Sequence, residues 1–483
     1  MTTTTLTPYS AAATRSGRAV WLGFVVVIVA SVMDLLDSTI AQTAAPAIHR
    51  DLGGSYADLE WISAAYTLAM SSMLLLGSRL GDAFGRRRVL LVGIAGFIGA
   101  SVLCGLAPTP VTLVVARALQ GAIGALMVPQ TFGITRELFG DEGQQKAFGV
   151  IGPVMGLAAV AGPIVGGGLV NLNVFGTGWR GIFFVNVPLG LAALAVGRRY
   201  LPRVAPASPD ARVHGPSVLL AMAGSVALIY PLIQGRQDGW PAWSFAMLAA
   251  GVVLIGAFAL LQGARARQGK TPLVEPSILR RRPFVAGLAV VVGFIGAMGG
   301  MMIALNVMYQ TGLGFSPLAC GVATVSIPLA AIAGSITSSA LLPAIGRRTM
   351  HIGIVTMAIG LVVVVIVLRA QSGGLSAWSL AGPLALTGFG MGMVFVPMFD
   401  VILAGVAPHE IGSASGLLES VQQLSMSIGI AAVGTVLFDR VGAGHGPAAF
   451  VGAADHGLVV AIVLLAAAAL AVFWLPRHAR AAG

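Results

Sequence analysis

Two aspartates interrupt the first apolar run of the chain, in the stretch MDLLDSTI. Asp34 and Asp37 are three residues apart, so both lie on one side of a helix, about one turn from each other. Like charges at this spacing disfavour simultaneous ionisation. The pair is therefore suited to hold a proton at neutral pH and to release it when a cation arrives.

Three further charged residues, Arg117, Asp400 and Glu419, lie inside apolar runs. An ionised acid near the centre of a membrane helix costs about 2.5 to 3.5 kcal/mol, so a chain that keeps such residues needs a reason. A buried carboxyl can also take up and release a proton near neutral pH. Simpler interpretations remain open: Arg117 could snorkel to the near surface, Glu419 could be interfacial, and Asp400 could anchor a helix end.

Other chemistries have little support in the sequence. The histidines fall in predicted loops or tails or, in the case of His351, at the end of a predicted span, so neither a histidine relay nor a metal site is expected. The string closest to a nucleotide-binding loop, at residues 263–271, has the wrong glycine spacing and runs into Pro272, so no cofactor is expected. Cys104 and Cys320 lie in apolar segments, which argues against a disulfide framework.

Long apolar runs must position the charged residues. The 483 residues are 57% hydrophobic and 9% charged, whereas soluble domains have about 25% charged residues. Fourteen runs are each long enough to cross a hydrocarbon core as a helix. They are 19–42, 58–80, 88–107, 111–134, 146–171, 179–197, 215–234, 242–263, 284–309, 317–343, 349–369, 377–405, 413–438 and 457–475. The sequence therefore predicts an all-α integral membrane protein.

Positive charge is distributed unevenly between the two sides of the predicted helices. An even number of spans places both termini on one side, and the segments on that side hold 22 of the 28 Lys and Arg residues. The positive-inside rule makes this side cytoplasmic. We therefore expect a multi-pass protein of the plasma membrane with both termini in the cytoplasm. The same distribution accounts for the net charge of +11, so no nucleic-acid partner is needed.

Two hydrophilic stretches rich in Pro and Arg, 198–214 and 263–283, bracket the seventh and eighth spans. Six spans precede this pair and six follow it, a layout typical of transporters built from two related bundles. The turn GDAFGRRRVL in the first half is echoed by PAIGRRTMHI in the second, although any inner loop tends to collect arginine. The predicted organisation is a cytoplasmic tail 1–18, an N-terminal six-helix bundle 19–197, basic loops and inserted helices 198–283, a C-terminal six-helix bundle 284–475 and a cytoplasmic tail 476–483.

Two motifs have a clear physical rationale. In SRLGDAFGRRR, Asp82 can pair with nearby arginines such as Arg86 and Arg87, while Gly85 permits a tight reversal between helices. In AGPIVGG, Pro163 removes a backbone donor and bends the helix, and Gly162 allows close packing.

Together with LDSTIAQTAAP (36–46), LVVARALQGAIG (113–124) and WRGIFFVNVPLG (179–190), these motifs resemble the fourteen-helix drug:proton antiporter family of the major facilitator superfamily, over essentially the whole chain. Ser78 stands where the family has glycine.

The resemblance implies a function and roles for several residues. The turn with Asp82 would act as a cytoplasmic latch that breaks and re-forms as access alternates, and the motif with Gly162 and Pro163 favours antiport. Among the aspartates of the first span, the resemblance singles out Asp37 as the proton or cation site. Asp34 would then be the neighbour that tunes it.

These expectations combine into a proton-coupled antiporter that exports lipophilic, cationic drugs or toxic small molecules by alternating access, functioning as a monomer within the lipid bilayer. An adaptable pocket could be lined by aromatic, methionine and amide side chains, although lipid-facing packing explains these residues equally well. They are Tyr309, Gln310, Met393, Phe395 and Phe399.

Two alternatives to this function differ in their fit to the sequence. One is a dedicated exporter of a single endogenous lipid, peptide or antibiotic, which the sequence does not distinguish from a broad drug pump. The other is an intramembrane aspartyl hydrolase, which would normally take its two acids from facing helices rather than from one helix. Enzyme activity is therefore not expected.

Overall fold

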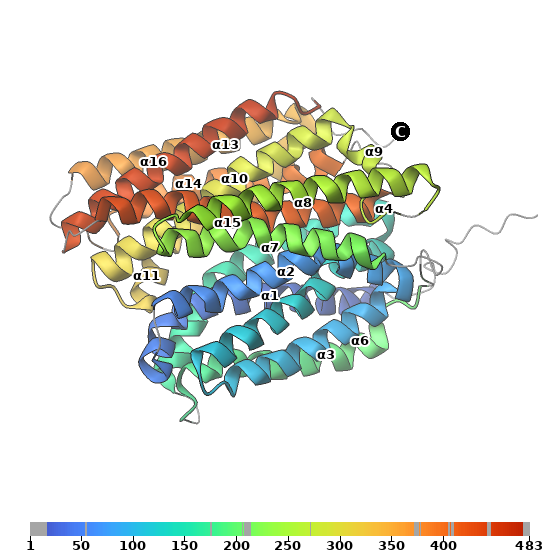
Figure 1. Ribbon diagram of the computed structural model, residues 1–483, viewed down its shortest axis with the longest axis horizontal. Helices are drawn as coiled ribbons and strands as arrows, with labels where there is room; N and C mark the ends of the chain where they lie inside the picture. Colours follow the sequence, from blue (N-terminus) through green and yellow to red (C-terminus); the bar gives the residue numbers. More distant parts are fainter. Residues whose placement is uncertain are drawn as a thin grey trace, which may run out of the picture.

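The computed structural model of the protein is helical, and no strand occurs in the residues that it describes (Figure 1). The described residues are 17–53, 56–173, 176–204, 206, 214–270, 272–370, 376, 378–403, 406, 410–441 and 446–476. The long helices run roughly side by side along the longest axis of the molecule. Helices satisfy their backbone groups internally, as a lipid environment requires.

The N-terminal bundle is built from the first part of the chain. Its elements are α1 (Gly17–Leu52), α2 (Tyr56–Phe84), α3 (Arg86–Gly105), α4 (Pro110–Leu172), η3 (Gly178–Arg180), α5 (Gly181–Phe184) and α6 (Asn186–Tyr200). The predicted spans 111–134 and 146–171 are joined in α4, which is broken at Gly140, where φ is 66° and ψ is −179°. Glycine adopts this backbone conformation without a steric penalty.

An inserted hairpin and the C-terminal bundle make up the rest of the described chain. The hairpin consists of α7 (Gly215–Gln237) and α8 (Ala242–Arg267), and the short α9 (Pro276–Leu279) follows it. The C-terminal bundle contains α10 (Arg282–Asn306), η4 (Val307–Gly312), α11 (Pro317–Thr324), α12 (Ser326–Ile345), α13 (Arg348–Ala370), α14 (Ala381–Leu403), α15 (Ile411–Val441) and α16 (Pro447–Val472).

The order of these helices is consistent with the fourteen predicted spans. Twelve segments of the described chain are long and apolar enough to cross a membrane. The apolar part of α14, Ala381–Phe395, is shorter, and the second half of α4 is not among the twelve. Both nevertheless coincide with predicted spans, so each predicted span has a helical counterpart in the structure.

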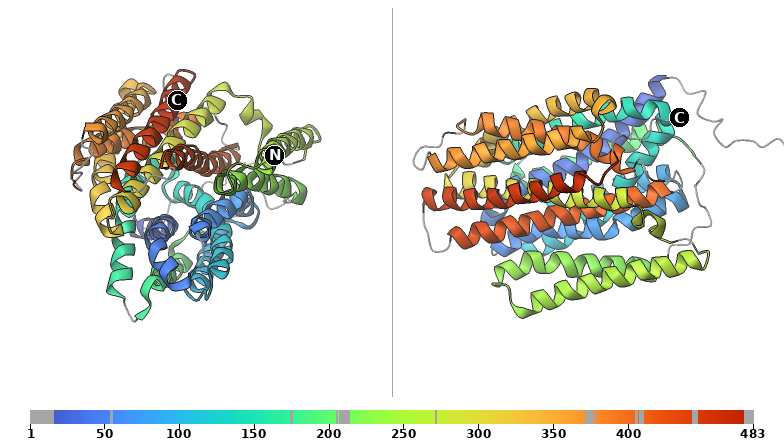
Figure 2. Two further views of the ribbon diagram at one scale, coloured as in Figure 1. Left: turned by 60° about the vertical axis from the view of Figure 1, so that its left-hand side comes forward. Right: turned by 90° about the horizontal axis from the view of Figure 1, so that it is seen from above.

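The two bundles meet along two seams. One seam is formed by α2 and α15, and the other by α4 with α11 and α12. The inserted hairpin lies on one side of the molecule, where α7 packs against both α2 and α15 (Figure 2). At one end of this contact, Trp61 Nε1 donates a hydrogen bond of 3.0 Å to Gln234 Oε1.

Glycines allow several helices to approach closely. A Cβ placed on Gly429 of α15 would overlap the carbonyl group of Gly296 on α10. Helices that associate in lipid lack a hydrophobic drive between them, so such close backbone packing contributes strongly to their stability.

Replacing Gly429 with alanine is expected to lower the stability of the protein by about 1 to 3 kcal/mol, because α10 and α15 must move apart. Thermal unfolding in detergent measures the change. The matched control is Gly452→Ala on α16, where a Cβ has nothing within 4 Å and alanine improves helix propensity. Equal losses in the two variants would contradict the prediction.

Candidate functional site

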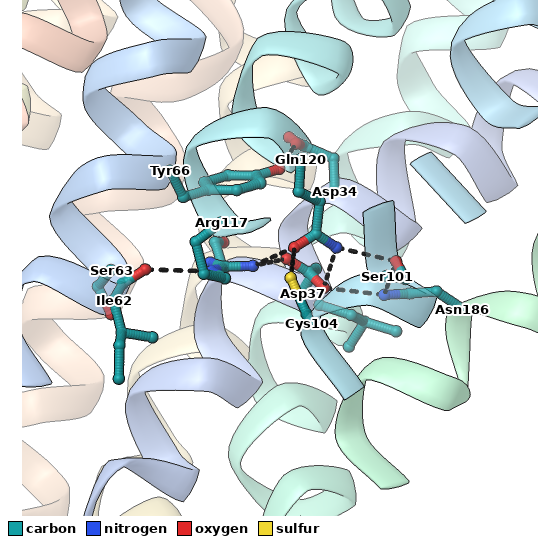
Figure 3. A network of polar contacts seen from close by, with 12 residues as sticks. Asp34, Asp37, Ile62, Ser63, Tyr66, Ser101, Cys104, Arg117, Gln120 and Asn186 are labelled. Carbon is teal, nitrogen blue, oxygen red and sulfur yellow. Dashed lines mark hydrogen bonds and ion pairs between the residues drawn. The ribbon is translucent and has the colours of Figure 1, made fainter. Parts of the chain in front are cut away.

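Asp37 of α1 lies at the centre of a buried polar network in the N-terminal bundle (Figure 3). Its carboxylate forms an ion pair with Arg117 of α4. It also accepts hydrogen bonds from Gln120 Nε2 at 2.9 Å and from Asn186 Nδ2 at 2.8 Å. Asp37 is 3% exposed and Arg117 is 0% exposed. In each of these contacts the carboxylate oxygens accept from a nitrogen donor.

The network connects four helices. Gln120 Nε2 and Asn186 Nδ2 both donate to Ser101 Oγ on α3, at 2.9 Å and 3.2 Å. Gln120 Oε1 accepts a hydrogen bond of 2.7 Å from Arg117 Nη1 and one of 3.3 Å from Cys104 Sγ. Because the polar groups satisfy one another, α1, α3, α4 and α6 are joined at one level inside the bundle.

Arg117 is anchored inside the bundle rather than snorkelling to a surface. Its Nε donates to the carbonyl oxygen of Ile62 at 3.1 Å, and its guanidinium carbon lies 4.3 Å from the ring centroid of Tyr66 on α2. The approach of α4 to α2 depends on Gly121, because a Cβ there would overlap the Tyr66 carbonyl group. The side chain therefore has a hydrogen-bonded and ring-stacked environment that favours its charge.

Asp34 has a different environment from Asp37, although it lies only one turn away. Its Oδ1 accepts a hydrogen bond from Tyr66 Oη. The side chain retains accessible surface, and within the described residues it has no ion pair with a lysine or arginine. The structure thus separates the two aspartates: Asp37 has a full counter-charge, whereas Asp34 has a neutral phenol.

Glu419 comes from the opposite bundle and faces the same region. It lies on the side of α15 that packs against α2, since Gln423, one turn further on, is 3.9 Å from Met70 Sδ. Glu419 retains accessible surface and accepts a hydrogen bond of 3.1 Å from Gln422. Met70 lies one turn beyond Tyr66 on α2, and Tyr66 is the hydrogen-bond partner of Asp34. One partly accessible acid from each bundle therefore lies near the α2–α15 seam.

The predicted turn between α2 and α3 is formed with its charges in contact. Arg86 lies 3.3 Å from Asp82 and 3.5 Å from Glu137 of α4, bridging the two acids. Gly85 has a φ of 88°, in the region that favours glycine. Arg87 donates instead to a backbone carbonyl, that of Arg198, at 2.6 Å.

The echoed turn in the second half has the same backbone feature. Gly346 has a φ of 53°, and Arg347, which follows it, donates to the carbonyl oxygen of Phe473 at 2.7 Å. In both halves an arginine after the turn glycine ties two helix ends together, which agrees with an internal repeat of the bundles.

Gly162 of the second half of α4 lies directly against α1. A Cβ placed there would overlap Oγ1 of Thr39, two residues beyond Asp37. The side chain of the neighbouring Pro163 lies outside the described residues, as do the side chains of Phe399 and Asp400. The expected roles of these three residues remain predictions.

The residues expected to line a pocket are packed within the C-terminal bundle. Tyr309 is 0% exposed and stacks on Phe315, with ring centroids 5.3 Å apart, and Met393 is 2% exposed. Phe395 packs edge-on against Phe294, and Gln310 donates to Asn306. Tyr309 and Met393 therefore face the interior of the bundle rather than lipid, and the expected role of these residues in a pocket stays a prediction.

Several residues of the site were not predicted from sequence. Gln120 and Asn186 lie in the motif stretches quoted above, but only their position in space shows that both contact Asp37. Ser101 and Tyr66 lie in apolar runs without any pattern that distinguishes them from packing residues.

At the end of the molecule remote from the arginine-rich turns, Asp51 links α1 to the segment before α6. Its Oδ2 accepts hydrogen bonds from Trp179 Nε1 at 2.8 Å and from Arg180 Nη1 at 2.6 Å. These two donors lower the pKa of Asp51 below its ordinary value. The Asp51–Arg180 pair is half-exposed, unlike the pair formed by Asp37.

A helical membrane protein with two packed bundles and charged residues near their interface has the architecture of a secondary transporter. Within the described part of the chain, no group of three or more His, Cys, Asp or Glu residues could hold a metal ion. The family model of the Major Facilitator Superfamily matches residues 27–430, so the chain belongs to this superfamily. Members of this family are transporters rather than enzymes.

Relatives over most of the chain are bacterial transport and resistance proteins. The chain is 41% identical to a probable actinorhodin transporter of Streptomyces coelicolor, over 87% of this chain and 73% of the relative. It is 36% identical to a puromycin resistance protein of Streptomyces alboniger, over 96% of this chain and 92% of the relative. A solved proton:xylose symporter shares the fold, with a TM-score of 0.64, 14% identity and 95% coverage of each chain.

Proposed function

We propose that the protein is a proton-coupled antiporter of the cell membrane that exports lipophilic, cationic drugs or antibiotics by alternating access as a monomer. Export of such compounds is supported by the two relatives, whose names refer to the antibiotics actinorhodin and puromycin. In the proposed orientation, the arginine-rich turns and both termini face the cytoplasm, in keeping with the positive-inside rule.

The observation that carries proton coupling is the contrast between the acids of the site. Asp37 has a full counter-charge in Arg117, so loss of its negative charge would leave a buried guanidinium without a counter-charge. Asp34 and Glu419 come from opposite bundles, and neither has an ion pair with arginine or lysine among the described residues. We assign the exchangeable proton to Asp34 and Glu419, and give Asp37 the role of a fixed anion that positions Arg117.

The same contrast suggests how a cation could exchange with a proton. With both acids ionised, two negative charges approach each other, which favours either protonation or the binding of a positively charged group between them. A lipophilic cation that binds there would displace protons. Movement of the bundles about the α2–α15 seam would then change the distance between the two acids.

A dedicated exporter of one antibiotic remains the second candidate. It is favoured by the single compounds after which the two relatives are named. Efflux measured over a panel of structurally unrelated dyes and antibiotics distinguishes the candidates, because a dedicated exporter moves one chemical class alone.

Efflux into inverted vesicles energised by a proton gradient tests proton coupling. Collapse of the gradient by an uncoupler is expected to stop transport, and addition of a cationic substrate is expected to release protons from the purified protein. Transport that persists without a gradient would exclude the proposal.

Asp34→Asn is expected to reduce substrate-induced proton release and to impair gradient-driven efflux, because the variant keeps the hydrogen bond to Tyr66 but leaves Glu419 as the one titratable group of the pair. The stability of the variant should stay within about 1 kcal/mol of the parent, since no charge is left unpaired. Asp51→Asn, which changes an exposed acid on the same helix, is the matched control and should transport normally. Normal proton release by Asp34→Asn would show that the proton is carried elsewhere.

A further inference from the structure

The segment that follows the inserted hairpin, residues 272–281, contacts both bundles; we call it the tie segment. On the N-terminal side it accepts hydrogen bonds from Arg79 of α2. Arg79 Nε and Nη2 donate to the Leu273 carbonyl oxygen at 3.1 Å and 2.8 Å, and Nη2 also donates to the Pro272 carbonyl oxygen. A guanidinium thus spans two successive carbonyls of the segment, a geometry that needs its planar set of donors.

On the C-terminal side, the tie segment binds Glu410, the residue immediately before α15. Arg281 Nη2 donates to Glu410 Oε2 at 2.8 Å, and Ser277 Oγ donates to Oε1. Glu410 is 3% exposed, and a buried carboxylate needs hydrogen-bond donors such as these. The segment is therefore fastened by a charged group from each bundle.

The inserted hairpin holds the tie segment in place. The backbone N–H of Leu273 donates to Gln262 Oε1 of α8 at 2.7 Å, and Gln262 Nε2 donates to Ser217 Oγ of α7 at 3.0 Å. Gln262 is 2% exposed. Leu273 and Val274 are buried in an apolar cluster with Leu75 of α2 and residues of both hairpin helices. A flexible linker would have none of these contacts.

The tie segment lies where α2 and α15 also touch directly. A Cβ placed on Gly416 of α15 would lie 3.6 Å from Ser78 Cβ and 3.5 Å from Leu75 Cδ2. Arg79 follows Ser78, and Glu410 precedes Gly416 by six residues. The two charged contacts of the tie segment therefore flank the closed contact between the bundles at the arginine-rich end.

We propose that the inserted helix pair and the tie segment form a latch that holds α2 and α15 together at the arginine-rich end, with Arg79 and Glu410 as its two attachment points. Opening of this end requires at least one of these contacts to break. The hairpin is the rigid support that keeps the short tie segment ordered. This role concerns bundle movement alone, so it is independent of the substrate and of proton coupling.

Thiol labelling of Gly416→Cys in purified protein, reconstituted in nanodiscs, tests the latch. The introduced thiol is covered by α2 while this end is closed, so its labelling rate by a polar maleimide follows the open population. Arg79→Gln and Glu410→Gln are each expected to raise that rate about tenfold, the effect of losing one charge-assisted contact. Arg88→Gln and Arg280→Gln, which remove exposed arginines next to the same elements, should leave it unchanged.

Two further measurements separate the latch from unfolding and from a plain charge effect. The same substitutions are also made in protein that keeps Gly416. There, labelling of Cys104 and Cys320, which are free and buried, reports unfolding. An equal increase there would overturn the proposal. The exchanged pair Arg281→Glu with Glu410→Arg should restore slow labelling, because it re-forms the ion pair. Unchanged labelling of the introduced thiol in both Arg79→Gln and Glu410→Gln would also overturn the latch.

Discussion

Asp37→Asn is expected to destabilise the protein by about 3 to 5 kcal/mol, because it leaves the guanidinium of Arg117 buried without a counter-charge. Arg117→Gln should cost a similar amount for the reciprocal reason. Removing both charges, in Asp37→Asn with Arg117→Gln, should cost clearly less than the sum of the single changes. Thermal or denaturant unfolding in detergent gives the loss of stability for each of the three variants. Comparing them in a double-mutant cycle isolates the interaction energy of the Asp37–Arg117 pair.

The exposed pair Asp51–Arg180 is the control for this cycle. Both side chains retain substantial accessible surface, so Asp51→Asn should change stability by no more than about 1 kcal/mol. Additive losses for Asp37→Asn and Arg117→Gln would mean that the two residues do not act as a pair. Recovery of proton-coupled efflux in the doubly neutral variant would strengthen the view that Asp37 is not the proton carrier.

A disulfide formed in the double variant Ser78→Cys with Gly416→Cys is expected to stop efflux by locking α2 against α15. The Cβ atoms at the two positions would be 3.6 Å apart, and disulfides typically join Cβ atoms about 3.5 to 4.5 Å apart. Oxidation should form the bond without large movement of the backbone. Efflux is measured in vesicles before and after oxidation, and a reductant should restore it.

Each single cysteine variant is the control for the crosslink. Oxidation of Ser78→Cys alone or of Gly416→Cys alone should leave efflux as it was, since Cys104 and Cys320 are buried. If the crosslinked protein transports at the rate of the reduced protein, the α2–α15 contact does not open during the cycle. That result would exclude alternating access at this seam.

The helices were predictable from sequence because hydrophobic length is a local property. The inserted pair was recognisable because the basic loops on both sides of it interrupt a regular series of apolar runs. The tight reversal at Gly85 was also predictable, since the turn motif specifies it within a few residues. The union of two spans in α4 was not, because the polar stretch between them has no apolar pattern that predicts a helix.

The site was predictable residue by residue but not as an arrangement. A charge in an apolar run identifies Asp37 and Arg117 separately, whereas their pairing across 80 residues of sequence is a result of packing. The ranking of Asp37 over Asp34 as proton carrier followed from the family motif. The structure gives a physical reason to reverse it, because Tyr66, which no motif identifies, is the partner of Asp34.

Pocket residues were the least predictable part. Methionines and aromatic residues at helical spacing occur both in packed interiors and around ligands, so Tyr309 and Met393 could not be assigned from sequence alone. Both are buried in the C-terminal bundle, and their role in a pocket stays a prediction.

The position of α7 has a consequence for the route by which a lipophilic compound reaches the interior. Because α7 packs on both α2 and α15, it shields that seam from the surrounding acyl chains (Figure 2). On that side, a compound dissolved in one leaflet would contact α7 rather than the seam between the bundles. Lateral entry from the bilayer should therefore take place on the other side, where the long, broken helix α4 approaches α11 and α12.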